Sequence, residues 1–435
     1  MYRYILSIIQ IIAVSLTVHG AITVDGSQFK VITEKPDAST GLDEVVVVYN
    51  TEGVKLSYTS TSSTTVKWSK FGNMGGGYAE PITSVTYSGL ISTIDASKED
   101  AGYIIEDTGR FYYFWVVNYA NHYMTANNLT VGPESDCSMA QLLFSGTAGH
   151  IYYYSINGRQ MELNRDIEIA YNTLRFDENT EYYRLEPVSE LLSSISGESI
   201  HIPSPLCNTT FSLTGDRFLK AWGKQVSITS NEMNAIAVEA TTRATEELRD
   251  VPNEKRAENG DAMGGSAPCE VRFRAEVTDA AVFTEWQFSQ TQDFEEITLR
   301  MSEKEIDYTF REEGNTYVRF VCANASGSCE YYGDVYTISI GESALDCPNA
   351  FSPGASEGVN DEWRVSYKSI VSFECHIFNR AGVKMISLTD PSQGWDGKYG
   401  GKVVPAGVYF YVIKAMGADG KEYKLSGDIN VINYK

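Results

Sequence analysis

Val271-Arg272-Phe273-Arg274-Ala275-Glu276-Val277 is the stretch of this sequence that decides the fold class. Apolar and charged residues alternate through it without a break. Because successive side chains of a β-strand point to opposite faces of its sheet, the apolar residues share one face and the charged residues share the other. One face is then buried and the other hydrated, as in an antiparallel sheet. The stretch predicts a β-sandwich that begins near Cys269.

The residues that follow this strand support a sandwich over residues 269–345. A tryptophan, Trp286, lies on the next predicted strand, and the run Tyr308-Thr309-Phe310 precedes the strand Gly314-Asn315-Thr316-Tyr317. This order of motifs resembles the PKD (polycystic-kidney-disease repeat) family. The resemblance implies an immunoglobulin-like β-sandwich.

Similar β-rich runs extend upstream. Trp68 and the later run Asp107-Thr108-Gly109-Arg110-Phe111 have the layout of an immunoglobulin-like sandwich. Further along, Asn157-Gly158 separates two strand-like runs and predicts a hairpin with a type I′ turn, because both central residues of that turn need positive φ. A polar stretch from Thr241 to Pro268 is typical of an exposed linker.

The length of the chain sets the number of domains. A chain of 435 residues is too long for one hydrophobic core. The fold class that we expect is all-β, with tandem immunoglobulin-like and PKD-like β-sandwiches and a C-terminal β-sandwich. The expected boundaries are 1–20 for a signal peptide, 21–125 for an immunoglobulin-like sandwich, 126–205 for a β-sandwich, 206–268 for strands plus a polar linker, 269–345 for the PKD-like sandwich and 346–435 for a terminal domain.

Charge and the N-terminus bear on partners and location. The net charge is −22, so nucleic acid and anionic lipid would be repelled, and neither is an expected partner. Arg3 is followed by an apolar stretch, Tyr4 to Val18, and by the small residues Gly20 and Ala21, which is the layout of a secretory signal peptide. A membrane anchor is the competing interpretation, but the run is short for a span. We expect no transmembrane segment in the mature chain.

Seven cysteines are present, and an exported chain passes through an oxidising compartment where disulfides form. The candidate pairs are Cys137 with Cys207 and Cys347 with Cys375. The other three cysteines then compete for one bond, and an odd count leaves at least one thiol free. No repeated Cys-x-x-Cys spacing indicates zinc. The competing residues are Cys269, Cys322 and Cys329.

No catalytic constellation is recognisable in the sequence. The histidines outside the predicted signal peptide are scattered, and no His-Glu-x-x-His or Gly-x-Ser-x-Gly motif occurs. Adjacent carboxylates such as Asp177-Glu178 arise from an acidic composition, and neighbours on a strand point to opposite faces. Oxygen ligands at Asp177, Asn179 and Glu181 would suit calcium, but no Gly follows to make the sharp turn. We therefore expect no enzyme, no metal and no cofactor.

Aromatic side chains offer a binding hypothesis instead. Tyr152 and Tyr154 would project from one face of a strand beside a hairpin tip, where they could stack on sugar rings or on a protein partner. Phe111, Tyr113 and Trp115 form a second row of this kind. The alternative is that one face of each strand is simply core.

The last 89 residues contain a series of separated motifs. Val371, Phe373, Cys375 and Ile377 are expected on one strand face, as are Val408, Phe410 and Val412 on another strand. The motif residues are, in chain order, Asn349, Phe351, Pro353, Asn360, Asp361, Phe378, Asn379, Arg380, Trp395, Asp396, Gly397, Pro405, Gly407 and Tyr409.

In that order, the motifs resemble the gliding-motility-associated C-terminal domain, the type B sorting module of type IX secretion. Two positions depart from the family pattern. The usual Asn-Gly-Asp-Gly loop is replaced by residues 354–358, and Ala381 stands where a Trp is common after Asn-Arg. The first change removes oxygen ligands, so no cation is expected in that loop.

The resemblance implies a destination. The type IX outer-membrane export machinery would recognise the tail, and the protein would be secreted or held on the outer surface of a Gram-negative bacterium with type IX secretion. We expect a non-catalytic protein whose sandwiches serve adhesion or bind a glycan or protein ligand. The alternative is a structural or accessory component of a surface or gliding-motility assembly.

Overall fold

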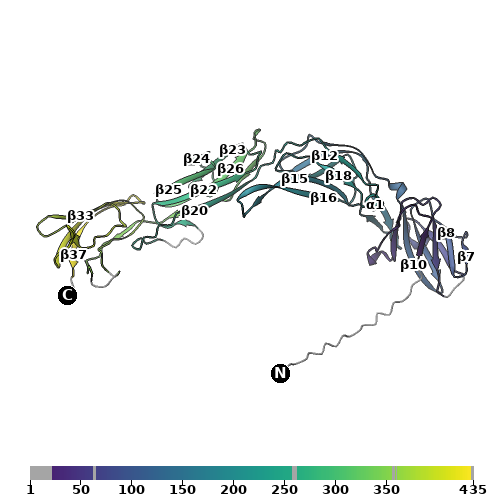
Figure 1. Ribbon diagram of the computed structural model, residues 1–435, viewed down its shortest axis with the longest axis horizontal. Coiled ribbons are helices and arrows are strands. Elements are labelled where there is room, and N and C mark those ends of the chain that lie inside the picture. The colour runs from purple at the N-terminus through teal and green to yellow at the C-terminus, as the bar shows by residue number, and fades with distance from the viewer. Residues whose placement is uncertain (1–21, 62–64, 257–261, 355–357, 359, 433–435) are drawn as a thin grey trace, which may run out of the picture.

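The computed structural model describes residues 22–61, 65–256, 262–354, 358 and 360–432, so the predicted signal peptide lies outside the described residues. The fold is all-β, built of successive β-sandwiches. We call them module 1 (residues 22–118), module 2 (125–229), module 3 (240–340) and module 4 (344–432). They follow one another end to end in a curved array, with modules 1 and 4 at opposite ends (Figure 1).

Module 1 packs two sheets around Trp68, whose ring meets the edge of Phe114 at a centroid distance of 6.2 Å. The valine-rich strand β3 is almost entirely buried, because one face serves this core and the other faces module 2. The first sheet has the order β1 (Ile22–Asp25), β4 (Lys55–Thr59), β8 (Ile91–Asp95) and β7 (Thr86–Ser88). The second has the order β2 (Ile32–Glu34), β3 (Glu44–Val48), β10 (Arg110–Asn118), β9 (Ala101–Asp107), β5 (Lys67–Phe71) and β6 (Glu80–Pro81).

Module 2 extends beyond the boundary expected at residue 205. Strand β18 pairs with β15, and β19 pairs with β18, so residues 206–229 complete this sandwich. The short helix α1 (Arg217–Ala221) follows β18. The sheets are β11 (Thr125–Val131), β12 (Met139–Thr147) and β17 (Ser199–Pro203); β13 (Ile151–Tyr154) and β14 (Gln160–Leu163); and β16 (Tyr182–Leu192), β15 (Ile167–Asp177), β18 (Ser212–Gly215) and β19 (Val226–Thr229).

Module 3 contains the alternating strand that fixed the fold class. Val271, Phe273 and Ala275 are buried, as predicted, and their charged neighbours lie on the other face. One sheet is β20 (Ala240–Glu246), β22 (Cys269–Val277) and β25 (Glu305–Phe310). The other is β21 (Met263–Gly264), β28 (Tyr336–Ile340), β26 (Gly314–Ala323), β23 (Phe283–Ser289) and β24 (Leu299–Met301), with β27 (Glu330–Tyr332) on β26.

The polar stretch from Thr241 to Pro268 begins with a strand rather than a linker. Strand β20 pairs with β22 along its whole length, because the small and β-branched residues of its sequence suit a half-buried strand. Residues after it reach module 4, where the amide of Lys255 donates to the carbonyl of Tyr367 at 2.7 Å. The stretch therefore completes one sandwich and contacts the next.

Module 4 is a five-stranded sheet with shorter strands around it. Phe373, Cys375 and Ile377 are buried as expected, but a bulge between Ile370 and Ser372 turns Val371 toward module 3. The sheets are β30 (Ala350–Phe351), β37 (Glu422–Val431), β36 (Gly407–Gly417), β32 (Ile370–Phe378) and β33 (Lys384–Leu388); β29 (Ala344–Asp346) and β31 (Ser366–Lys368); and β34 (Lys398–Tyr399) and β35 (Lys402–Val403).

The face expected to be apolar on β36 is the outer one. Tyr409 and Ile413 are buried, whereas Phe410 and Val412 remain 41% and 44% exposed. Every residue from Val408 to Ile413 is apolar or aromatic, so alternation could not distinguish the two faces. Tyr409 and Tyr411 lie on the inner face, where they pack against Trp395 and Trp363 respectively.

Modules 1 and 2 share one continuous core. Trp115 and Phe71 of module 1 belong to the same cluster of buried residues as the interior of module 2. Beside this cluster, buried Asp216 accepts from Arg165 Nε at 2.8 Å and from the hydroxyl of Tyr119 at 2.9 Å. Tyr119 belongs to the segment that leaves module 1, whereas Arg165 and Asp216 belong to module 2. The buried Arg165–Asp216 ion pair therefore helps to fix the two modules together.

Both expected disulfide pairings differ from the structure. Cys137 is bonded to Cys329, because the loop between β11 and β12 reaches the loop between β26 and β27. Cys207 is a buried free thiol whose sulfur lies 3.5 Å from the carbonyl of Asn172. Cys375 is buried in the core of module 4 and Cys347 is half-buried, and both are free thiols. Cys269 and Cys322 are also free.

Candidate binding cleft between modules 2 and 3

The aromatic pair predicted to bind a ligand lies in a different setting from the one expected. Tyr154 packs against Trp115 at a centroid distance of 5.5 Å, and Tyr152 stacks on His150 at 5.2 Å. The hairpin tip beside them is docked on module 1, where the carbonyl of Ile156 accepts from Gly76 at 2.7 Å. Tyr154 and Ile156 are therefore partly buried against the core that modules 1 and 2 share, and a binding role for Tyr152 and Tyr154 stays a prediction.

The turn at this tip also differs from the prediction. Only Gly158 has positive φ, at 78°, and its amide donates to the carbonyl of Ser155 at 2.9 Å. This is a type I turn followed by a glycine bulge rather than a type I′ turn. The hairpin itself is confirmed by the pairing of β13 with β14.

The second aromatic row runs from solvent into the joint with module 2. Phe111 is 54% exposed, Tyr113 is half-buried and Trp115 is buried. Phe111 and Tyr113 stack with centroids 6.2 Å apart. The row is therefore partly surface and partly core.

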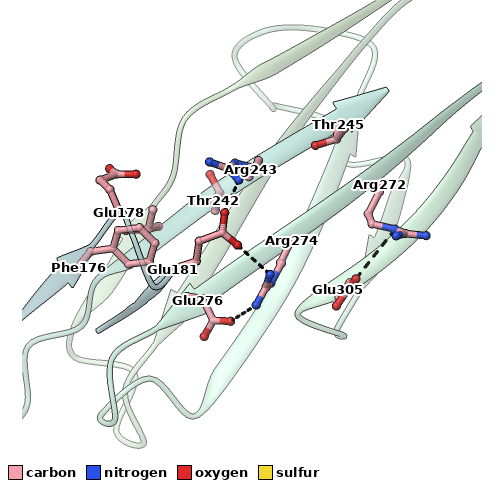
Figure 2. A pocket seen from close by; sticks show the side chains of 11 residues that line it. Phe176, Glu178, Glu181, Thr242, Arg243, Thr245, Arg272, Arg274, Glu276 and Glu305 are labelled. Carbon is pink, nitrogen blue, oxygen red and sulfur yellow. Dashed lines mark hydrogen bonds and ion pairs between the residues drawn. The ribbon is translucent and has the colours of Figure 1, made fainter. Parts of the chain in front are cut away.

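A cleft lies where the hairpin of β15 and β16 reaches over module 3. It encloses about 330 Å³ and is drawn in Figure 2. Module 2 supplies one wall and the outer face of the β20-β22-β25 sheet supplies the other. The lining residues are Phe176, Glu178, Glu181, Thr241, Thr242, Arg243, Thr245, Arg272, Arg274, Glu276 and Glu305.

Strand register gathers the polar groups of the module 3 wall. Arg243 lies opposite Arg274, and Arg274 lies opposite Glu305 on the next strand. Arg272 is two residues from Arg274, so it shares the same face of the sheet. The hydrated face that the alternation of β22 predicted is thus the floor of the cleft.

Glu181 connects the two walls. It ends the loop of the β15–β16 hairpin with φ of 57°, and its carboxylate accepts from Arg243 and, at 3.1 Å, from Arg274. Arg274 also donates to Glu276 at 3.2 Å, and this hydrogen bond raises the pKa of its guanidinium. Figure 2 shows the carboxylates of Glu181 and Glu276 on either side of Arg274.

Arg272 forms a separate pair on the same floor. It donates to Asp307 at 2.8 Å, and this hydrogen bond raises the pKa of the guanidinium. Each of the three arginines has a carboxylate partner, which orients its guanidinium and leaves further N–H groups that could donate to a ligand. Such fixed, planar donors are suited to oriented polar contacts.

Aromatic side chains border the polar floor. The ring of Phe176 meets Tyr183 at a centroid distance of 5.4 Å, and the Tyr183 hydroxyl lies 3.1 Å from Thr241 Oγ1. Burial raises the pKa of Tyr183, so it stays a neutral phenol at physiological pH. Tyr182 is exposed, with the guanidinium of Arg274 6.0 Å from its ring centroid.

The cleft therefore offers guanidinium donors, carboxylate acceptors, threonine hydroxyls and one aromatic side chain, Phe176. None of its residues was predicted as a site. Glu181 was considered with Asp177 and Asn179 as a calcium loop, but the carboxylate of Asp177 accepts from the amide of Asn179 at 2.9 Å and Glu181 points to arginines. Among the residues described, no group of three or more His, Cys, Asp or Glu could hold a metal ion.

Several sorting-motif residues form the interior of module 4. The ring of Trp395 lies between those of Phe351 and Tyr409, at centroid distances of 5.4 and 5.2 Å. The Tyr409 hydroxyl donates to the carbonyl of Pro405 at 3.1 Å. Gly397 has φ of 68°, and a β-carbon there would lie 2.9 Å from Pro353. These residue types are therefore explained by packing.

Other motif residues organise turns. Asp361 accepts from the amides of Gly354 at 2.9 Å and Gly358 at 2.7 Å, and Asn379 accepts from the amides of Ala381 and Val383, each at 2.9 Å. Asn349 and Asn360 accept hydrogen bonds through their backbone carbonyls, and Asp396 forms an ion pair with Lys398. Gly407 has φ of 150°. Phe378 lies opposite Phe410 on the outer face of the sheet, and Arg380 is exposed.

In the part of the chain that the structure describes, no helix has the length and apolar character needed to cross a membrane.

Comparisons with known proteins agree with this architecture. Residues 130–230 match the family described as fibronectin type III domain. The matched segment begins within β11 and ends just after β19. Residues 345–431 match the CHU_C type IX secretion signal domain. No curated protein matches the chain.

Solved structures of tandem domains are also similar, at low identity. A tetra-tandem repeat from the extending region of a large adhesion protein has 10% identity and a TM-score of 0.23, covering 95% of this chain and 100% of that one. The FN1-FN3 domains of chicken CNTN1 have 11% identity and a TM-score of 0.24, covering 70% and 98%. A Ca²⁺-stabilized adhesin that helps an Antarctic bacterium bind ice has 11% identity and a TM-score of 0.18, covering 93% and 99%.

At these scores, the solved structures say nothing of what this chain binds. The two family matches are local, and each coincides with one sandwich of the structure. The chain therefore carries a fibronectin type III or immunoglobulin-like domain and, at its C-terminus, a type IX secretion signal domain.

Proposed function

We propose that this chain is a non-catalytic protein that type IX secretion exports from a Gram-negative bacterium, and that it binds a glycan outside the cell. The predicted signal peptide would take it across the inner membrane, and module 4 would direct it to the outer-membrane export machinery. The observation that carries the binding proposal is the cleft between modules 2 and 3. It joins an aromatic side chain, Phe176, to several charged and hydroxyl groups, and ligand sites commonly combine apolar and polar groups in this way.

The charge of the cleft favours a neutral ligand. Its lining contains three arginines and four glutamates, which gives a net charge of 3 − 4 = −1. Each arginine already faces a carboxylate, and the chain as a whole carries −22, so an acidic polysaccharide would be repelled. Hydroxyl groups of a neutral sugar can both donate to glutamate and accept from arginine or threonine.

The size of the cleft limits the ligand. A volume of about 330 Å³ lies at the lower end of the range for ligand pockets, so a short segment of a sugar chain would fit. The rim aromatics Phe176 and Tyr182 would contact the apolar faces of sugar rings. Adhesion would follow if the glycan belongs to another surface.

The test is a glycan array that presents neutral and acidic oligosaccharides to the mature full-length protein. We expect binding to neutral members and a loss of about 10-fold or more in affinity for Arg243→Ala, because one charged hydrogen-bond donor is removed. Arg175→Ala is the matched control, since Arg175 is another exposed arginine paired with a glutamate, Glu186, outside the cleft. A blank array, or equal losses in both variants, would contradict the proposal. Binding confined to acidic glycans would overturn the neutral assignment.

A structural role is the second candidate, and the contacts that join each module to the next favour it. Modules 1 and 2 share a core, modules 2 and 3 share a disulfide, and the segment after β20 contacts module 4. A chain with such joints would act as a spacer in a surface or gliding-motility assembly. If the protein bound no member of the glycan array, and immunoelectron microscopy showed it in a regular assembly on the cell surface, this role would be supported over glycan binding.

A further inference from the structure

The disulfide joins two modules rather than two strands of one module. Cys137 lies between β11 and β12 near the start of module 2, and Cys329 lies between β26 and β27 near the end of module 3. The two cysteines are 192 positions apart in the sequence. Almost all of both sandwiches therefore lies inside one covalently closed loop.

This connectivity creates a short covalent route through the molecule. Tension applied between module 1 and module 4 passes along the backbone to Cys137, across the sulfur–sulfur bond to Cys329, and on to module 4. The backbone between the two cysteines is outside that route. Of modules 2 and 3, only the segments outside the closed loop remain in the line of force, namely β11 of module 2 and β27 and β28 of module 3.

The cleft lies wholly inside the closed loop. Every residue that lines it has a number between 137 and 329. Its two walls belong to different modules, so it would open if those modules separated. The disulfide joins the two modules covalently. Glu181 of module 2 also pairs with Arg243 and Arg274 of module 3.

We propose that the Cys137–Cys329 disulfide makes this chain a load-bearing tether, in which residues 138–328 of modules 2 and 3, and the cleft that they form, are shielded from tension. Ion pairs on an exposed surface are weak, and these pairs would not hold the modules together under load. A covalent bond does so without any change in the resting structure. The proposal does not depend on a ligand in the cleft.

The extension that the bond withholds can be calculated from chain geometry. An extended chain spans about 3.3 to 3.6 Å per residue. For a sequence separation of 192, the bond withholds roughly 650 Å of contour length when the rest of the molecule unfolds. Modules 1 and 4 have no share in this quantity, because they lie outside the closed loop.

The test is force spectroscopy on the full oxidised chain, held at its two ends. We expect the total contour length released by the Cys137→Ser variant to exceed that of the original protein by roughly 650 Å. Cys207→Ser is the matched control, because Cys207 lies within module 2 but is unbonded, and it should release the same length as the original protein.

A second measurement does not require a variant that folds. At a constant force that unfolds the tethered chain, addition of a thiol reductant to the original protein should produce one further extension as the bond breaks. Equal contour lengths for the original protein and Cys137→Ser, or no step on reduction, would overturn the proposal. A non-reducing peptide map of the exported protein without a Cys137–Cys329 cross-link would overturn it as well.

Discussion

The ring of Phe71 lies directly over Gly102 on the neighbouring strand. The two residues are register partners of β5 and β9, and a β-carbon on residue 102 would lie 2.1 Å from Cζ of Phe71. Phe71 in turn packs against Trp115 at a centroid distance of 5.7 Å, within the core that modules 1 and 2 share. Glycine at this position is therefore a requirement of space, since its φ is not positive.

Replacement of this glycine should weaken both modules. Gly102→Ala forces the Phe71 ring out of place, and overpacking of a core costs about 1 to 3 kcal/mol of the free energy of unfolding. Gly72→Ala is the control, because a β-carbon there would meet nothing within 4 Å. Urea denaturation of the two variants measures the difference. If both alanine variants were as stable as the original chain, the interlock of Phe71 with Gly102 would have no energetic role.

Trp395 should be the residue on which module 4 depends most. It is 0% exposed, lies between two other rings and exchanges backbone hydrogen bonds of 2.9 Å with Trp363. Trp395→Ala is expected to cost about 3 to 5 kcal/mol and, if the export machinery recognises the folded module, to reduce the secreted fraction. Tyr399→Ala is the control, since Tyr399 is 51% exposed in the same module. Normal secretion of a Trp395→Ala chain whose module 4 is unfolded would contradict recognition of the folded form.

The fold class was predictable wherever one face of a strand is charged. In β22, arginines alternate with Val271, Phe273 and Ala275, so the buried face is unambiguous. In β36 both faces are apolar, and the choice between Tyr409 and Phe410 depends on tryptophans that come from distant segments. Which face of β36 is buried is therefore decided by tertiary packing and not by the periodicity of its sequence.

The cleft and the disulfide were beyond prediction for a different reason. Glu181 and Arg274 are far apart in the sequence, and only the docking of module 2 on module 3 brings them within 3.1 Å. The alternation of β22 did predict that Arg272 and Arg274 share a hydrated face, which is the floor of the cleft. No local pattern indicates which module would cover that face, or that Cys137 would reach Cys329.

Buried thiols should make the stability of modules 3 and 4 depend on alkaline pH. Burial raises the pKa of Cys269 and of Cys375 from the ordinary value of 9.0 to about 12, and that of Cys322 to about 11. In the unfolded chain these thiols lose their protons near pH 9. Between pH 9 and about 12 the unfolded state therefore binds fewer protons than the folded state, and the free energy of unfolding falls as the pH rises.

The magnitude can be set for one thiol. Since one pKa unit corresponds to about 1.4 kcal/mol, Cys375 alone should lower the free energy of unfolding by about 2 kcal/mol between pH 8 and pH 10.5. Well below pH 8 the same thiol contributes no pH dependence, because it is protonated in both states. Urea denaturation at pH 8 and at pH 10.5 measures the fall, and Cys375→Ala should reduce it by the share of that thiol. An equal fall in the variant would show that Cys375 ionises in the folded protein as readily as in the unfolded one, which its place in the core of module 4 opposes.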